Sequence, residues 1–166
     1  YTILDSYTLQ QIDLLETEEE KSSARAEARE TQWQNKTITD TYEPGSVFKI
    51  VPASAALEEG TATVNSTYYC NGVVEFKDGS GTLSIHCHNR SGHGQESFIQ
   101  ALVNSCNPAL MEIGLGLGQD RFFEYYQAYG LTEKTGIDLP AERVGVYYDE
   151  TMSNISLASC SFGQSN

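Results

Sequence analysis

A serine and a lysine three positions apart, Ser46 and Lys49, are the first residues of this sequence whose types and spacing suit covalent chemistry. On a helix this spacing places both side chains on one face. A serine hydroxyl becomes a good nucleophile only when a neighbouring group takes its proton, and a desolvated lysine can be that base. The S-x-x-K pattern alone is a weak signal, because a helix-capping serine followed by a surface lysine gives the same letters.

A second polar element, Ser105-Cys106-Asn107, lies between two stretches with helical patterns. In S-x-x-K enzymes, a second serine and an asparagine complete a proton-relay and hydrogen-bond network around the lysine. The triplet can also be interpreted as a turn or a helix cap, since Pro108 follows it directly. The two elements together favour a serine nucleophile with a lysine base.

Cysteine and histidine gather in one stretch of the chain, where Cys70, Cys87 and His93 follow the pattern C-x16-C-x5-H. Two thiolates and an imidazole suit a tetrahedral zinc ion. The fourth ligand could be His88, His86, a carboxylate or water. Alternate residues of a strand point to opposite faces, so both of these histidines face away from Cys87 unless the strand has ended there.

Two other interpretations of these residues stay open. Cys70 and Cys87 could form a disulfide outside the cytoplasm, or both could be free thiols, with His93 only shaping the loop. A zinc ion here would be structural and would hold the segment beside the active-site cleft, because a serine mechanism needs no metal-activated water. Cys106 and Cys160 are interpreted as small packed side chains. Catalysis itself is expected to need no cofactor.

The sequence patterns around these candidate residues predict a mostly helical scaffold with one small β-hairpin. The stretch 46–59 has helical spacing and a stop at Gly60, with Pro52 as an internal kink. Two β-rich runs joined by the turn-forming letters KDGSG predict a hairpin over 67–88, with two of the cysteines near its open end. The remaining expectations are a solvated helix over 13–32, helical segments over 96–118 and 119–129, a loop-rich stretch over 131–150, and a helical or irregular stretch over 151–162.

Composition and charge limit the classes of partner. The chain has 166 residues and a mass of 18.3 kDa, which fits one domain or part of a larger one. With 23 acidic residues against 10 lysines and arginines, the formal net charge is −13, which argues against nucleic-acid binding and against adsorption to an anionic membrane. The sequence contains no apolar run long enough to span a bilayer and no visible signal peptide, so we expect any targeting segment to lie outside this chain.

Five stretches of the chain carry further motifs: YEPGSVFKI at 42–50, GHG at 92–94, NSCNPA at 104–109, GLTEKTGIDLP at 130–140 and SFGQS at 161–165. Together they resemble the transpeptidase domain of class B penicillin-binding proteins. The resemblance is closest to the Gram-positive branch that includes the sporulation and the elongation or division enzymes. It covers the chain from about Trp33 to Ser165.

The resemblance implies a role for each matched residue. Ser46 corresponds to the nucleophile that is acylated by substrate and by β-lactams, and Lys49 to the general base. Ser105 corresponds to the relay serine, and Asn107 to the residue that hydrogen-bonds the lysine and the substrate. The implied reaction is attack on the D-Ala-D-Ala amide of a peptidoglycan stem peptide. D-Ala leaves, and the amine of a second stem peptide resolves the acyl-enzyme.

The third motif of the family, K-T-G or K-S-G on a sheet strand, is not matched. Lys134-Thr135-Gly136 has the right letters, but it precedes SFGQS, whereas the family's motif follows that stretch. We therefore expect residues 1–166 to be a partial transpeptidase domain. Its expected fold class is α+β, the mostly helical portion of a penicillin-binding-protein or serine β-lactamase-like domain. The expected portion has a small hairpin, lacks most of the central antiparallel sheet, and is not a catalyst alone.

The resemblance also implies partners and a location. The partners are peptidoglycan stem peptides and β-lactams, and the location is the extracytoplasmic face of a bacterial membrane. The membrane anchor and the cell-wall synthesis complex would belong to the longer parent protein. Two alternatives stay open: a serine β-lactamase or β-lactam sensor, and a non-catalytic interaction module stabilised by zinc.

Overall fold

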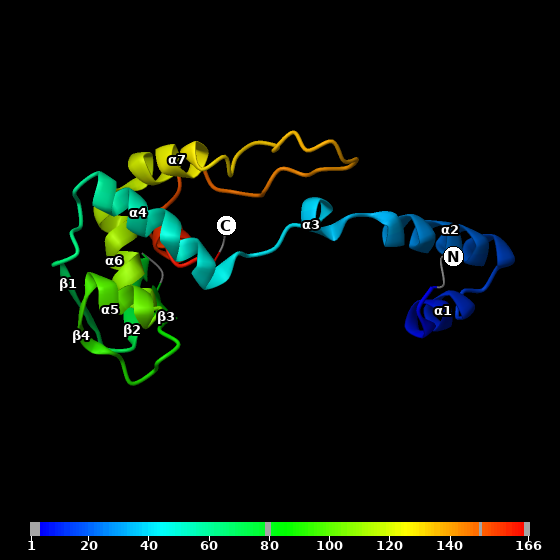
Figure 1. Ribbon diagram of the computed structural model, residues 1–166. Coiled ribbons are helices and arrows are strands. Elements are labelled where there is room, and N and C mark those ends of the chain that lie inside the picture. The colour runs from blue at the N-terminus through cyan, green and yellow to red at the C-terminus, as the bar shows by residue number, and fades with distance from the viewer. Residues whose placement is uncertain (1–3, 79–80, 150, 165–166) are drawn as a thin grey trace. The chain divides into compact units, whose positions relative to one another are not determined.

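Figure 1 shows the computed structural model, which describes residues 4–78, 81–149 and 151–164. Within these residues the chain forms two compact units. One unit comprises residues 4–40 and 137–143, and the other comprises residues 41–136 and 144–164. In the described part of the chain, no helix is both long enough and apolar enough to cross a bilayer.

The first unit consists of helices α1 (Ser6–Asp13), α2 (Glu18–Trp33) and α3 (Lys36–Thr39). Helix α2 begins with a capping box, in which Thr17 and Glu20 satisfy each other's backbone N–H groups. None of its residues is buried, which confirms the solvated helix expected from its charge, although it begins later than predicted. Helix α1 was not expected. It is capped by the side chain of Asp5, which accepts a hydrogen bond from the backbone N–H of Thr8.

The second unit is built around one buried helix. Seven of the eleven residues of α6 (Asn107–Leu117) are buried, and helices α4 (Ile50–Glu58), α5 (Phe98–Val103), α7 (Gln119–Ala128) and α8 (Asn154–Cys160) all contact it. The helical segments expected over 46–59 and 119–129 are present, and the stretch 151–162 contains the helix α8. The stretch 131–150 is irregular where described, as expected. The expected helical stretch over 96–118 is interrupted at residues 104–106, between α5 and α6.

Two apolar clusters fill this unit, and α4 contributes to both. One cluster contains Ala53 and Ala56 of α4, packed with residues of α5 and α6. The other contains Ala55 of α4 with Phe48 and Phe122. The ring of Phe48 lies 5.6 Å from that of Tyr126 between centroids.

The predicted helix over 46–59 has two parts. A 3₁₀-helix, η1 (Gly45–Lys49), leads directly into α4. Pro52 lies in the first turn of α4. Backbone N–H groups in the first turn of an α-helix have no intrahelical acceptor, so the N–H that proline lacks is not needed there. Pro52 therefore marks the start of the α-helix instead of the expected kink. Gly60 ends α4 with a φ of +68°, as its position predicts.

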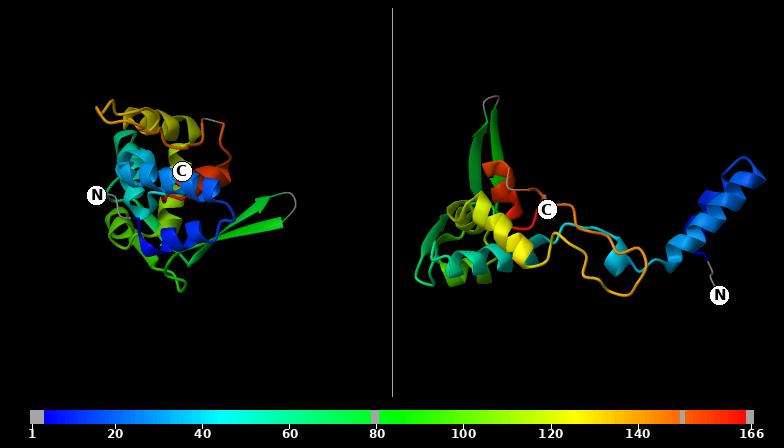
Figure 2. Two further views of the ribbon diagram at one scale, coloured as in Figure 1. Left: turned by 90° about the vertical axis from the view of Figure 1, so that its right-hand side faces the viewer. Right: turned by 90° about the horizontal axis from the view of Figure 1, so that it is seen from above.

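Four short strands form two antiparallel pairs. Strands β2 (Val73–Asp78) and β3 (Gly81–His86) make the hairpin, which extends away from the helices of its unit in Figure 2. The prediction was wrong for the first strand, because β1 (Thr67–Cys70) leaves this hairpin and pairs with β4 (Gly94–Ser97). The turn at Gly72, with a φ of +91°, redirects the chain between β1 and β2. The strand β4 was not expected from the sequence.

Candidate active site and cysteine cluster

The 3₁₀-helix η1 carries Ser46 and Lys49. A 3₁₀-helix has three residues per turn, so side chains three apart lie directly above one another. Ser46 is exposed, whereas Lys49 is only 3 % exposed. The local fold therefore gives the two members of the S-x-x-K pattern opposite environments, an accessible hydroxyl beside a desolvated amine.

The amine of Lys49 has its three donors fully used. Its Nζ donates to the carbonyl oxygen of Ser105 at 2.6 Å, to the hydroxyl of Ser105 at 2.8 Å and to Oδ1 of Asn107 at 2.7 Å. None of these three bonds runs to Ser46. Burial lowers the pKa of Lys49 to about 8, because desolvation disfavours the charged ammonium. The structure thus joins the two polar elements that the sequence singled out.

Ser105 is held in a conformation that is rare for a residue with a side chain. Its φ is +51°, in the left-handed region, at the break between α5 and α6. Its backbone N–H donates to Leu102 at 3.0 Å, and the N–H of the next residue, Cys106, donates to Ala101 at 2.8 Å. This turn directs both the carbonyl and the hydroxyl of Ser105 at Lys49. Such strain is maintained only where the surroundings enforce it.

A cavity of about 340 Å³ opens beside these groups. It is lined by polar Ser46, Lys49, Ser54 and Ser105, and by apolar Ile50, Ala53, Leu57, Phe98 and Leu102. The candidate nucleophile Ser46, the candidate base Lys49 and the hydroxyl of Ser105 therefore share one cavity, and its apolar walls would limit competition from water.

The SFGQS stretch contacts the start of η1. The N–H of Gly45 donates to the carbonyl of Gly163 at 2.9 Å. Gly163 has a φ of +87°, and a Cβ at this position would overlap the carbonyl oxygen of Gly45. Ser165, the last residue of the stretch, lies outside the described residues. Lys134-Thr135-Gly136 lies in an irregular segment after α7 and in no strand.

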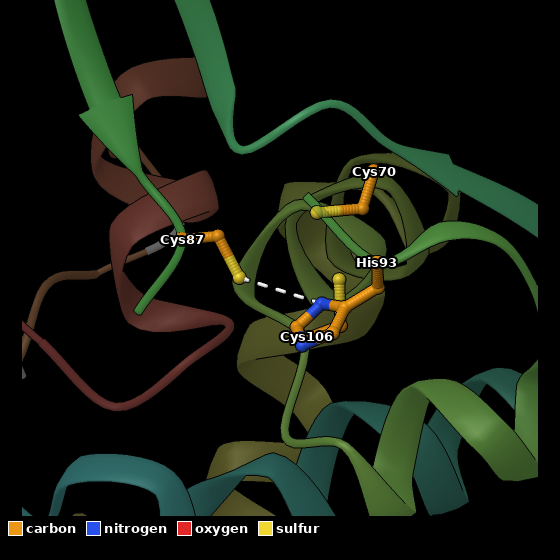
Figure 3. A group of neighbouring side chains, drawn as sticks. All are labelled: Cys70, Cys87, His93 and Cys106. Carbon is orange, nitrogen blue, oxygen red and sulfur yellow. Dashed lines mark hydrogen bonds between the residues drawn. The ribbon is translucent and has the colours of Figure 1, made fainter. Parts of the chain in front are cut away.

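A group of four potential metal ligands lies next to this site. The ligand atoms of Cys70, Cys87, His93 and Cys106 all lie within 4.8 Å of one another. Figure 3 shows the three sulfur atoms and the imidazole ring converging from four separate segments, with Sγ of Cys87 3.7 Å from Nδ1 of His93. All three cysteines are buried, and none is in a disulfide.

This group overlaps only in part with the ligands expected from the sequence. The structure brings Cys70, Cys87 and His93 together, and it adds Cys106, which was interpreted as a packed small side chain. His88 lies outside the group: it is exposed, with its Nδ1 3.8 Å from Sγ of Cys87 and its ring 5.2 Å from that of His93. The spacing C-x16-C-x5-H-x12-C would have been the signal for the fourth member.

Two turns support the cysteine cluster through direct backbone packing. A Cβ on Gly72 would overlap the carbonyl oxygen of Arg90, and a Cβ on Gly92 would overlap that of Cys70. The N–H of Cys87 donates to the carbonyl of Gly72 at 2.9 Å. Glycine is therefore required at both positions for the segments to approach as closely as they do.

The thiols of Cys106, in the cluster, and of Cys160, outside it, are poor nucleophiles. Burial raises the pKa of Cys106 well above that of an ordinary thiol, and it raises the pKa of Cys160 to about 12. Without a bound metal, neither forms appreciable thiolate at neutral pH. Cys106, the cysteine within the S-x-N triplet, is therefore a poor candidate for the nucleophile.

Comparison with known proteins identifies the family. A model of the penicillin binding protein transpeptidase domain matches residues 11–166. Stage V sporulation protein D of Bacillus subtilis is 38% identical over 132 residues, which are 78% of this chain and 20% of that protein. Peptidoglycan D,D-transpeptidase FtsI of Escherichia coli is 30% identical over 135 residues, which are 78% of this chain and 21% of that protein. The chain thus spans about a fifth of the length of these relatives.

Solved structures agree on the fold. A Burkholderia ambifaria protein described as a peptidoglycan glycosyltransferase gives a TM-score of 0.71 at 24% identity, over 80% of this chain and 41% of that one. Pseudomonas aeruginosa PBP2 gives 0.72 at 23% identity, over 86% of this chain and 34% of that one. The expected fold class, a mostly helical α+β portion of such a domain, is confirmed. The chain belongs to the penicillin-binding protein transpeptidase family.

Proposed function

We propose that this chain carries the acylating centre of a peptidoglycan D,D-transpeptidase that acts through an acyl-serine. The observation that carries the proposal is the environment of Lys49, a buried amine bonded to both Ser105 and Asn107. Several relatives are named peptidoglycan D,D-transpeptidases, which supports the general function.

In the proposed acylation step, the hydroxyl oxygen of Ser46 attacks the carbonyl carbon of the D-Ala-D-Ala amide, and Lys49 takes the hydroxyl proton. The amide C–N bond breaks, and D-Ala leaves as an amine after receiving a proton. Ser105 is suited to relay this proton, because its hydroxyl contacts Lys49 and lines the same cavity as Ser46. The amine of a second stem peptide then attacks the ester, releases Ser46 and forms the cross-link.

Binding of β-lactams follows from the same chemistry. Attack of Ser46 on the strained ring opens its amide, but the leaving amine stays tethered to the acyl group. The product is a covalent adduct on the serine. No cofactor is proposed for this chemistry.

The activity is assigned to the longer protein rather than to these residues alone. The described part of the chain contains no strand that bears a K-T-G motif, and such a strand would supply a further oxyanion donor. We therefore expect this chain by itself to be inactive. We place the working enzyme at the extracytoplasmic face of the membrane, anchored and complexed through parts beyond this chain.

The test is covalent labelling of the full-length protein by a fluorescent penicillin, followed by intact mass measurement. We expect one adduct, lost in Ser46→Ala and retained in Ser23→Ala, a matched change on the exposed helix α2. An adduct that hydrolyses rapidly would instead support a serine β-lactamase. Failure of the full-length protein to form any adduct would favour the non-catalytic module.

A further inference from the structure

We propose that Glu96 is a positioning residue for acylation: through the side chain of Asn104 it fixes the turn that directs the hydroxyl of Ser105 at Lys49. The contact between Glu96 and Asn104 rests on the geometry of the chain alone. Its effect on acylation rests also on the proposed function, which assigns the proton relay to Ser105.

Ser105 occupies the left-handed position of a Schellman motif at the end of α5, directly after the C-cap residue Asn104. The N–H of Ser105 donates to Leu102, and the N–H of Cys106 donates to Ala101, which are the two bonds that define the motif. Glycine is the usual residue at this position, because a Cβ is strained there. Serine brings a hydroxyl into the candidate active site but strains the backbone, so neighbouring contacts must hold the turn.

Glu96 holds the residue directly before this serine. Its Oε1 accepts a hydrogen bond from Nδ2 of Asn104 at 2.6 Å, a short contact of the charge-assisted kind. Glu96 is only 3 % exposed and lies on β4, where it is paired with Tyr68 of β1, so its carboxylate is a fixed point. Asn104 is exposed, so water would satisfy its amide without this bond. The bond therefore serves to position the end of the helix.

The second oxygen of this carboxylate argues against a purely stabilising role. Oε2 of Glu96 has no hydrogen-bond partner among the described residues. It lies 3.9 Å from Nδ1 of His93, which is beyond hydrogen-bond distance. A buried carboxylate oxygen without a partner is unfavourable, and replacing a buried charged group by a well-packed apolar side chain is often neutral or stabilising. The carboxylate is better suited to orienting the turn than to stabilising the core.

The turn is thus held at two successive residues. Lys49 bonds the carbonyl and the hydroxyl of Ser105, and Glu96 bonds Asn104. Without the second contact, the hydroxyl of Ser105 should spend less time in the relay geometry, which slows the chemical step. Neither Glu96 nor Asn104 lines the cavity beside Ser46, so the binding step that precedes acylation should change little.

The experiment separates binding from acylation in the full-length protein. Stopped-flow labelling with a fluorescent penicillin, over a range of concentrations, gives the dissociation constant of the first complex and the acylation rate constant. Glu96→Leu should lower the rate constant about tenfold and change the dissociation constant less than about twofold. Glu96→Gln keeps an acceptor for Asn104 and should bring the rate constant to within about threefold of the unaltered value. Gln95→Leu, the matched change at the neighbouring exposed position of β4, should have no effect.

Thermal unfolding of the same full-length variants separates positioning from folding. Glu96→Leu should melt no lower than the unaltered protein, because it removes a buried carboxylate with an unpaired oxygen. If this variant does not fold, Asn104→Ala decides the question, since it removes the same bond from an exposed side chain. Asn104→Ala should slow acylation as much as Glu96→Leu does, and the double variant should be no slower than either one.

An acylation rate constant that is unchanged in Asn104→Ala and in folded Glu96→Leu would overturn the positioning role. So would a slow rate that Glu96→Gln does not restore, or one that falls only in step with the melting temperature. These results leave the proposed function standing, because the unaltered protein is still labelled. If the unaltered full-length protein is never labelled, the proposed function itself fails, and the role of Glu96 fails with it.

Discussion

The backbone N–H of Gly45 is bonded to the carbonyl of Gly163, so the turn that carries the candidate nucleophile is fixed by a residue near the far end of the chain. No side chain takes part in this contact. The two backbones approach so closely that a Cβ on Gly163 has no room. The position of Ser46 thus depends on a glycine well separated from it in sequence.

Gly163→Ala should destabilise the protein by about 2–4 kcal/mol, because it combines a strained φ with a backbone overlap. Urea unfolding of the purified chain measures this. Gly116→Ala is the matched control, since it lies in α6 with ordinary φ and open space around it, and it should stabilise the protein by ~0.5–1 kcal/mol. Equal effects of the two substitutions would contradict the close approach.

Acylation of the full-length protein should accelerate as the pH rises through about 8, because only the neutral amine of Lys49 can take the serine proton. With this pKa, the neutral fraction increases roughly tenfold between pH 7 and pH 9. Rates of penicillin labelling across this range measure the effect. Lys49→Met should abolish labelling, and Lys134→Met, in the irregular segment, should leave the profile unchanged. A profile that is flat around pH 8 would rule out Lys49 as the base.

The same shift has a consequence for stability. The pKa of Lys49 is lower in the folded protein than in the unfolded chain, so the unfolded state binds more protons between about pH 8 and the ordinary lysine pKa of about 10.5. The contribution of Lys49 to the free energy of unfolding should therefore rise with pH in this window. It should be constant below it. Urea unfolding at several pH values, compared with Lys49→Met, isolates this contribution.

Phe48 and Val47 are sequence neighbours with opposite environments. Phe48 packs against Tyr126 and Phe122, with ring centroids 5.6 and 6.2 Å away, whereas Val47 is 72% exposed. Phe48→Ala should cost about 3–5 kcal/mol of unfolding free energy, and Val47→Ala less than about 0.5 kcal/mol. Thermal unfolding of both variants tests the pair. Similar losses would mean that η1 is not anchored through Phe48.

Glu96→Gln tests the carboxylate beside His93. The amide keeps the shape and the contact with Asn104 but removes the negative charge 3.9 Å from Nδ1 of His93. If the cysteine cluster holds zinc, the loss of this charge should lower zinc affinity while the fold is retained. Competition with a chromophoric chelator gives the affinity. Glu75→Gln, on the exposed face of β2, is the matched control and should bind zinc normally. Unaltered affinity in Glu96→Gln would exclude a role for this carboxylate.

The sequence predicted which residues form the candidate active site better than it predicted the backbone conformation that brings them together. Ser46, Lys49, Ser105 and Asn107 were expected to act together, and the structure joins three of them by hydrogen bonds. A turn at this triplet was one interpretation of the sequence, but the positive φ of Ser105 could not be predicted, because surrounding contacts impose it and no glycine marks it.

The pairing of β1 with β4 was missed for a related reason. Each strand has four residues, and the hairpin β2–β3 separates them in the chain. Short strands carry little periodicity, so a non-local pair leaves almost no pattern. Cys106 was missed as a metal-ligand candidate because it comes from the start of a helix rather than from the histidine-rich loop. The spacing C-x16-C-x5-H-x12-C includes Cys106, but only the folded chain shows that its sulfur lies near the other three ligand atoms.

Helix α4 belongs to both apolar clusters, through Ala53 and Ala56 on one side and Ala55 on the other. Neither cluster can separate from the other without unfolding the helix between them. The second unit should therefore melt in a single cooperative transition, and amides of α4 should exchange with solvent only through global opening. A protease should then cut α4, which continues directly from the 3₁₀-helix of Ser46 and Lys49, only when the whole unit opens.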